Sequence, residues 1–361
     1  MKRWVSIAVS LLILIVIYTR IDFAGLVQVF QQCDPVWMAI SLGMVVPLTL
    51  LTSWRLQQLM PRVMPRVMPK SEMLRGMPLA NPDSQEDSGF ARSPAIEPAA
   101  ASAATLSFGE ANRLILAASV LNMVLPSKMG DLAKSYFMRD RGHLEGSLAF
   151  SLVVFEKACD MLSLLVWCGF GLLLYPSKDP LFWIMTLATI GGLVSGVALL
   201  SWPAFARSVF AAGQRIAPGK MRRKLDRLSN SWQLMHDYFW SDRRQLAIVT
   251  LTSIVIWFLH LLQIWFFILA LRAFAPFLAN LALSPLAILA GLLPLTFAGV
   301  GTRDAALILF YQPYFAAPIG AALGLLCTSR YLLPAIGGLP FLGQYLLQLK
   351  RWQQPTAGPD Q

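Results

Sequence analysis

The stretch LAIVTLTSIVIWFLHLLQIWFFILAL, residues 246–271, contains no Asp, Glu, Lys or Arg. A helix needs about 20 mainly apolar residues to cross the hydrocarbon core of a bilayer, so this stretch predicts a transmembrane helix. Five other apolar runs predict further spans, at residues 4–18, 36–54, 147–174, 181–202 and about 319–349. The first run follows Lys2 and Arg3 and has no small-x-small cleavage site before Arg20, which predicts an uncleaved anchor.

The composition supports the same class of protein. Of the 361 residues, 56% are hydrophobic and 14% are charged, whereas soluble proteins have about 25% charged residues. Together with a mean hydropathy of +0.58, these values exclude a disordered chain, a collagen and a small disulfide scaffold. The net charge of +11 does not indicate nucleic-acid binding, because the basic residues flank apolar runs too long for a soluble core helix. We therefore predict an all-α polytopic integral membrane protein that binds no nucleic acid.

Two shorter apolar stretches, residues 114–126 and 285–300, run directly into polar sequence. The polar continuations lie in LPSKMGDLAKSYF (125–137) and LPLTFAGVGTRDAALILF (293–310). Each has a Leu-Pro, then one or two glycines, then an acid and a base, which predicts a helix break. A membrane tolerates such a break where protein or a water-filled cavity satisfies the backbone. We predict two re-entrant or broken helices, and inverted repeats of the transporter type if they enter from opposite sides.

Basic residues are distributed unevenly among the loops. Seven, beginning with Arg55, follow the second apolar run, and nine lie between the fourth and fifth runs. The opposite loops hold Arg20, Lys178 and Arg272. Because cytoplasmic loops carry an excess of Lys and Arg, we predict six full spans plus two re-entrant segments. The protein is then a multi-pass protein of the bacterial cytoplasmic membrane, with both termini in the cytoplasm.

We predict a single flippase-like membrane domain over residues 1–361 with two distinctive cytoplasmic segments. Residues 60–104 contain MPRVMPRVMP and then Pro, Ser, Ala and acidic residues without a helical period. This composition predicts a disordered insert, with a surface tether as the alternative. Residues 204–245 form a basic segment in which apolar residues recur at helical spacing from 221 to 239. That helix either lies on an anionic leaflet or packs against the membrane domain.

Ionisable side chains inside membrane spans are costly and are therefore functional candidates. Glu156 and Asp160 are four residues apart and share one helical face, while Lys157 lies about 100° around the helix. The whole set has four acids and four bases: Asp131, Glu156, Asp160 and Asp304, with Lys134, Lys157, Arg303 and Arg330. These groups either form ion pairs that hold the bundle together, or line a polar cavity in which Arg and Lys bind the phosphate of a lipid headgroup.

Motifs for catalysis, cofactors and metals are weak or missing. GVGTRD lacks the third glycine of a dinucleotide fingerprint and follows no strand, and the sequence has no P-loop, HExxH or GxSxG. The cysteines include no CxxC pair, and the histidines are scattered. These residues are Cys33, Cys159, Cys168 and Cys327, and His143, His236 and His260. We expect no cofactor, no metal site and no enzyme activity.

Four motifs occur in a fixed order along the chain. They are LNMVLPSKMGDLAKSYFMRD, SLVVFEKACDMLSLL, LLPLTFAGVGTRDAAL and TSRYLLPAIGG. Together they resemble the lysylphosphatidylglycerol synthase transmembrane family, the flippase-like domain also found at the front of the multiple peptide resistance factor. The resemblance covers about residues 105–175 and 285–345, with weaker likeness over the first two spans.

The resemblance implies a membrane domain that moves a modified or glycan-bearing lipid between leaflets. It implies a substrate site built from Pro126, Gly130, Asp131 and Lys134, from Glu156, Lys157 and Asp160, from Pro294, Gly299, Gly301, Arg303 and Asp304, and from Arg330. This sequence departs from the family where Lys134 and Lys157 replace the usual Arg and where Asp304 replaces the usual Glu. The insert at 60–104 is also longer than the family's loop.

The leading prediction is a lipid translocase for an anionic, aminoacylated or glycan-bearing lipid of phospholipid or isoprenoid type. No soluble transferase domain follows the last span, so we expect no transferase activity. One alternative is a membrane-embedded enzyme that acts on a lipid-linked substrate through Glu156 and Asp160. The other is an accessory subunit that recruits a soluble or membrane enzyme partner through residues 204–245.

Overall fold

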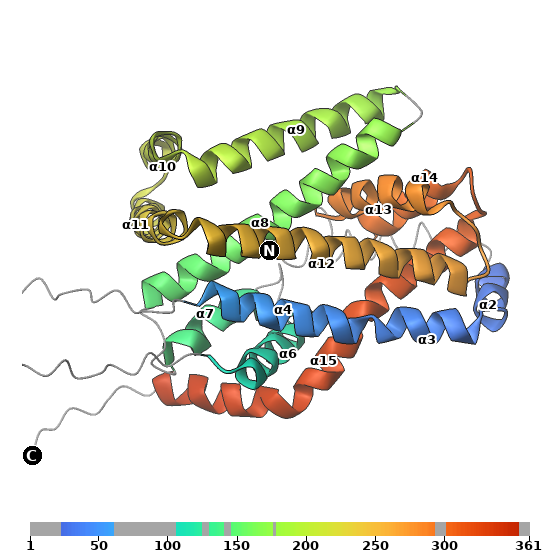
Figure 1. Cartoon of the computed structure of the whole chain (residues 1–361), viewed down its shortest axis with the longest axis horizontal. Helices are drawn as coiled ribbons and strands as arrows, with labels where there is room; N and C mark the ends of the chain where they lie inside the picture. Colours follow the sequence, from blue (N-terminus) through green and yellow to red (C-terminus); the bar gives the residue numbers. More distant parts are fainter. Residues whose placement is uncertain are drawn as a thin grey trace, which may run out of the picture.

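The computed structural model describes residues 23–60, 106–124, 130–140, 146–175, 178–292 and 301–353, and within these ranges the chain forms helices and no strand. The helices are α2 (Phe23–Gln31), α3 (Pro35–Gly43), α4 (Val45–Leu59), α6 (Phe108–Val124), α7 (Gly130–Asp140), α8 (Gly146–Leu174), α9 (Pro180–Ser201), α10 (Pro203–Ile216), α11 (Gly219–Ser241), α12 (Arg243–Ala270), α13 (Phe277–Gly291), α14 (Thr302–Tyr311) and α15 (Ala317–Gln353). Figure 1 shows α3 and α4 end to end, with α12 alongside them. The predicted all-α architecture is confirmed.

In the described ranges, four helical segments are long and apolar enough to cross a membrane. They are Pro35–Leu59 (α3 and α4), Pro180–Ser201 (α9), Arg243–Ala270 (α12) and Ala317–Gly343 in α15. Helix α8 is also long, with 29 residues, but carries Glu156, Lys157 and Asp160 near its middle. These five segments occupy the second to sixth predicted spans. The first predicted span, residues 4–18, and the predicted insert at 60–104, apart from Met60, lie outside the described residues.

The predicted broken segments correspond to two pairs of short helices. Helices α6 and α7 have 17 and 11 residues, and α13 and α14 have 15 and 10. Even the longest of them extends about 26 Å at 1.5 Å per residue, less than the roughly 30 Å of a hydrocarbon core. The breaks themselves, which contain Pro126, Pro294 and Gly299, lie outside the described residues.

The two halves of the bundle pack on each other reciprocally. Helix α6, from the first short pair, packs along α15, the long helix after the second pair, and α13 packs along α8, the long helix after the first pair. Glycines permit both approaches: a Cβ at Gly338 would lie 2.1 Å from the carbonyl oxygen of Leu116, and a Cβ at Gly171 would lie 2.3 Å from that of Ala282. Each short pair thus packs on the long helix that follows the other pair.

The basic segment forms α10 and α11, which lie at the end of the bundle where α4 ends and α8 and α12 begin (Figure 1). Trp232, Met235 and Phe239 of α11 are buried, and the Phe239 ring stacks on Phe155 of α8 with 3.8 Å between ring centroids. The second half of α11 therefore packs against the membrane domain, as one of the two alternatives predicted. Met221, near the start of α11, is 51% exposed.

Two apolar clusters fill the interior of the described part of the chain, and α8 contributes to both. One cluster contains Leu164, and the other contains Leu152, Phe155 and Cys159. Along α8, Asp160 falls where one cluster gives way to the other, and Glu156 falls between Phe155 and Cys159.

Candidate functional site

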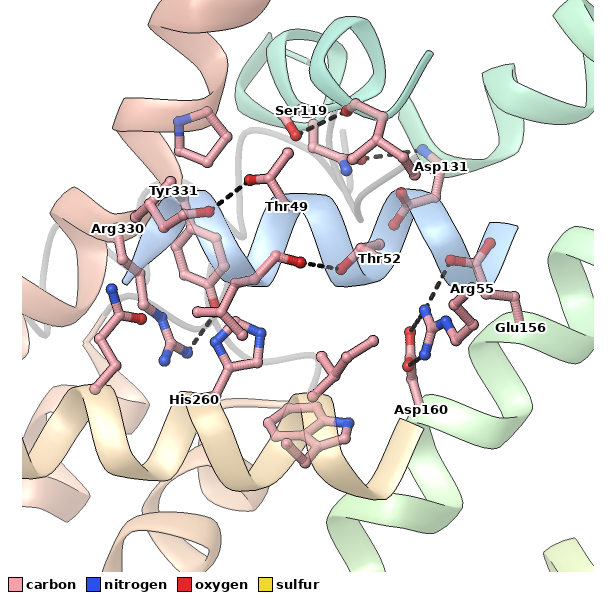
Figure 2. Close-up of a pocket in the computed structure, with 18 of the residues that line it drawn as sticks. Thr49, Thr52, Arg55, Ser119, Asp131, Glu156, Asp160, His260, Arg330 and Tyr331 are labelled. Carbon is pink, nitrogen blue, oxygen red and sulfur yellow. Dashed lines mark hydrogen bonds and ion pairs between the residues drawn. The ribbon is translucent and has the colours of Figure 1, made fainter. Parts of the chain in front are cut away.

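A cavity of about 330 Å³ lies among helices α4, α6, α7, α8, α12, α14 and α15. Its charged lining residues are Arg55, Asp131, Lys134, Glu156, Lys157, Asp160, Arg303 and Arg330. Figure 2 shows Arg330 at one side of the cavity and Arg55 with Asp160 at the other. We refer to these two sides as the Arg330 end and the network end.

Arg55 of α4 is the centre of the network end, and its side chain is 2% exposed. Its Nη2 donates to Glu156 Oε1 at 2.8 Å, and its Nη1 donates to Ser253 Oγ at 2.8 Å and to Asp160 Oδ1. Two carboxylates therefore share one guanidinium. A buried cation needs such compensation, because removal from water is costly for an unpaired charge.

The expectation that Arg55 belongs to a cytoplasmic loop is wrong. The apolar run ends at Trp54, but α4 continues to Leu59 and buries Arg55 against α8 and α12. The sequence contains a signal for this position. Thr49, Thr52 and Arg55 are spaced by three residues, which places three polar side chains on one helical face.

Lys134 and Lys157 extend the network to Asp131. Lys134 Nζ lies 2.9 Å from Glu156 Oε2 and 3.5 Å from Asp131 Oδ1, while Lys157 Nζ lies 2.9 Å from Asp131 Oδ2 and 3.4 Å from Asp160 Oδ2. Asp131 stands in the first turn of α7, where the positive end of the helix dipole favours an acid. The network end thus joins three cations and three anions drawn from α4, α7 and α8.

Gly130 positions the start of α7 against α6. A Cβ on this buried glycine would lie 2.5 Å from the carbonyl oxygen of Ala118. The next backbone amide, that of Asp131, donates to Asn122 Oδ1 at 3.2 Å. Gly130 therefore has a structural role beside the cavity and does not line it.

Arg303 and Asp304 form a second, separate ion pair at the start of α14. Arg303 Nη2 lies 2.6 Å from Asp304 Oδ1 and donates to Thr328 Oγ1 at 2.7 Å. Asp304 Oδ2 accepts from the backbone amide of Gly301 at 3.1 Å. Gly301 has φ of 101°, a conformation that favours glycine. Arg303 lines the cavity, with Gly301 and Asp304 behind it.

Arg330 of α15 is buried without a counterion among the residues that the structure describes. It is 4% exposed, its Nη2 donates to the hydroxyl of Tyr331 at 2.9 Å, and its guanidinium carbon lies 4.9 Å from the centroid of the Tyr331 ring. Within the described part of the chain it forms no ion pair, and its Nε and Nη1 have no hydrogen-bond partner. Burial leaves these two donor groups unsatisfied, which is costly unless a ligand pairs with them.

The charges at the site therefore do not cancel. The sequence predicts four acids and four bases, but Arg55 adds a fifth base. The four acids pair with Arg55, Lys134, Lys157 and Arg303. Among the described residues, Arg330 remains as one positive charge in excess, at the end of the cavity opposite the network (Figure 2).

The structure brings together seven of the predicted site residues as lining of one cavity: Asp131, Lys134, Glu156, Lys157, Asp160, Arg303 and Arg330. Sequence reasoning missed the polar lining residues Thr49, Thr52, Arg55, Ser119, Asn122, His260, Gln263, Thr328 and Tyr331. Over the ranges that the structure describes, no set of three or more His, Cys, Asp or Glu side chains is placed to hold a metal ion. The charged and polar lining residues can form ion pairs and hydrogen bonds.

Comparison with known proteins agrees with the helical membrane architecture. The family model described as the lysylphosphatidylglycerol synthase TM region matches residues 3–338. The chain is also similar to a UPF0104 membrane protein of Methanocaldococcus jannaschii, with 24% identity over 244 residues that cover 62% of this chain and 71% of that protein. No solved structure matches the chain. Because the match extends over nearly the whole chain and its apolar helices, this multi-pass membrane protein belongs to the lysylphosphatidylglycerol synthase transmembrane family.

Proposed function

We propose that this protein is a lipid translocase that accepts an anionic lipid headgroup in the cavity. The observation that carries this proposal is the buried Arg330, which has two donor groups without partners. A phosphate oxygen of a headgroup supplies both the missing negative charge and the missing acceptors. Charge-assisted hydrogen bonds of this kind are stronger than neutral ones.

The rest of the cavity supports transport of a polar group. Four acids paired with four bases make the walls polar without adding net charge, so the headgroup passes polar side chains while the acyl chains stay in the bilayer. The short helix pairs α6–α7 and α13–α14 contribute Asp131 and Arg303 from opposite halves of the fold. Broken helices that meet at a central site are typical of transporters.

We place the protein in the bacterial cytoplasmic membrane, with both termini in the cytoplasm and a phospholipid or an isoprenoid-type lipid as substrate. Helix α4 ends, and α12 begins, at the end of the bundle where α10 and α11 lie (Figure 1). The first basic loop starts after α4, and the second ends at α12. Excess Lys and Arg on one side of a membrane protein supports a cytoplasmic location for that side.

The contacts of Glu156 and Asp160 weigh against the alternative of a membrane-embedded enzyme. A general acid or base must reach the proton that it transfers, but Glu156 is bound to both Arg55 and Lys134, and Asp160 is bound to Arg55 and Lys157. We therefore propose translocation without a chemical step. Turnover of a lipid-linked substrate by the wild type but not by Asp160→Asn would contradict this proposal.

The test is translocation by the purified full-length protein in liposomes that contain a fluorescent anionic phospholipid in both leaflets. The probe that remains protected from a membrane-impermeant quencher reports the leaflet exchange rate. Loss of a charged hydrogen-bond partner predicts at least about a tenfold lower rate in Arg330→Gln. Arg244→Gln is the matched control, because Arg244 is an exposed arginine on α12. Exchange at the wild-type rate in a folded Arg330→Gln variant would overturn the proposal.

A further inference from the structure

Gln263 of α12 lines the same cavity as Arg330 and has an unsatisfied acceptor. Its side chain is fully buried, with an exposed fraction of 0%. The Nε2 group donates to the backbone carbonyl oxygen of Ser41 at 2.8 Å. Within the described residues, its Oε1 has no hydrogen-bond partner.

The contact with Ser41 fixes the orientation of the amide. A backbone carbonyl oxygen can only accept a hydrogen bond, so the amide nitrogen of Gln263 must face Ser41. The amide oxygen is therefore left without a donor. Buried polar atoms are nearly always paired, and a group in the cavity that Gln263 lines can supply the donor that Oε1 lacks among the described residues.

Three hydroxyl groups in the lining also act toward the cavity as hydrogen-bond acceptors. Thr49 Oγ1 donates to Val45 O at 2.7 Å and Thr52 Oγ1 to Leu48 O at 2.7 Å. Ser119 Oγ likewise donates to Ile115 O at 2.9 Å. Each hydroxyl thus uses its single proton within its own helix, so it can offer the cavity only acceptor lone pairs.

We infer that the cavity selects a headgroup that carries hydrogen-bond donors, hydroxyl or amine, beside its anionic oxygen. This inference rests on the proposed function, because it assigns the class of headgroup that binds with its anion at Arg330. Gln263 is the specificity-determining acceptor, and Thr49, Thr52 and Ser119 supply further acceptors. A headgroup that has an anionic phosphate but no donor satisfies Arg330 and leaves Gln263 unpaired.

The experiment compares anionic lipids that differ in donors but not in charge. Delipidated full-length protein is titrated with phosphatidylglycerol and with phosphatidylmethanol of the same acyl chains, and bound lipid is counted by native mass spectrometry. Phosphatidylglycerol has two hydroxyl donors and phosphatidylmethanol has none. We expect the wild type to bind phosphatidylglycerol about tenfold more tightly, as one buried hydrogen bond allows.

Gln263→Met removes the acceptor while keeping a side chain of similar length. We expect this variant to bind both lipids with the affinity that the wild type shows for phosphatidylmethanol. The matched control is Gln245→Met on the same helix, because Gln245 is also buried but lies outside the cavity lining and pairs with Tyr238 and with the backbone of Gln58. A loss of packing alone changes both affinities in either variant and does not change their ratio.

The outcomes separate this inference from the proposed function. Equal binding of the two lipids by the wild type, or an unchanged preference in Gln263→Met, would overturn the inference while Arg330 still binds an anion. Binding of phosphatidylglycerol by Arg330→Gln at wild-type affinity would overturn the proposed function itself. If Gln263→Met does not fold, Thr52→Val replaces it, because this change removes an acceptor from the cavity and keeps the side-chain shape. We expect Thr52→Val to reduce the preference about threefold, and an unchanged preference contradicts the selection of donors by acceptors in the cavity lining.

Discussion

The two ends of the cavity each contain a buried arginine, but they satisfy it in different ways. Arg55, at the network end, has contacts with Glu156, Asp160 and Ser253. Arg330, at the other end, has one hydroxyl partner, Tyr331, and no carboxylate among the described residues. The exposed fractions of the two residues are nearly equal, 2% and 4%. The two ends therefore do not differ in burial. They differ in the source of the negative charge that compensates the arginine.

This difference separates a structural charge cluster from a binding group. At the network end the chain supplies both signs of charge, so the energy of that end does not depend on a ligand. At the Arg330 end the chain supplies a cation alone, and a bound anion completes it. Substitutions at the network end should change stability, whereas substitutions at Arg330 should change the response to lipid.

The largest effect is expected for Arg55→Met. The substitution leaves Glu156 and Asp160 with Lys134 and Lys157 as their remaining cations, and removal of one partner from a buried ion pair costs about 3–5 kcal/mol. The melting temperature of the detergent-purified protein should therefore fall by several degrees or more. An unchanged melting temperature would show that the network is not structural.

In protein stripped of lipid, Arg330→Met should not lower the stability as Arg55→Met does. The substitution removes a buried cation without a counterion, so the stripped variant should be as stable as the wild type or about 1 kcal/mol more stable. An anionic lipid should raise the melting temperature of the wild type but not of this variant. A destabilisation as large as that of Arg55→Met would mean that the two ends do not differ.

The sequence predicted one end of this comparison and missed the main residue of the other. Arg330 interrupts an apolar run, and because a charged side chain inside a membrane span is costly, the sequence alone identifies it as a candidate functional residue. Arg55 follows an apolar run and precedes a basic loop, and its neighbours in sequence do not reveal that α4 continues past it. Its partners lie about 100 and 105 positions away on α8, a pairing that depends on tertiary structure.

The long helices and the short helix pairs were predictable because they follow from apolar length and from proline and glycine positions. Gln263 was not predictable, because a neutral glutamine inside the apolar run 246–271 carries no charge to mark it. Its role depends on contact with the carbonyl oxygen of Ser41, from a helix 222 positions away in sequence. Hydrophobic patterns fix which segments cross the membrane and not which polar atoms are left without partners.

A second unpaired arginine can be created with Asp304→Asn. Arg303 then loses its carboxylate and α14 loses an acid from its first turn, so we expect a loss of about 1–3 kcal/mol in the stripped protein. The anionic lipid should stabilise this variant more than the wild type, because two guanidinium groups then lack a counterion. The double variant Arg303→Met with Asp304→Asn should recover part of the stability, since removal of both partners is less costly than removal of one. Equal melting temperatures for the single and double variants would show that the pair is not coupled.

The smallest effect is expected for Lys157→Gln, and its control lies in the same network. Lys157 is 42% exposed, and its partners Asp131 and Asp160 keep Lys134 and Arg55 as cations after the substitution. Ion pairs with an exposed member contribute about 0–1 kcal/mol. Lys134→Gln removes a lysine whose side chain is 1% exposed and leaves the fully buried Glu156 with Arg55 alone, so it should destabilise the protein more than Lys157→Gln does. If the two variants lose the same stability, the contribution of each lysine does not depend on its burial. The contrast with Arg330 must then rest on lipid binding alone.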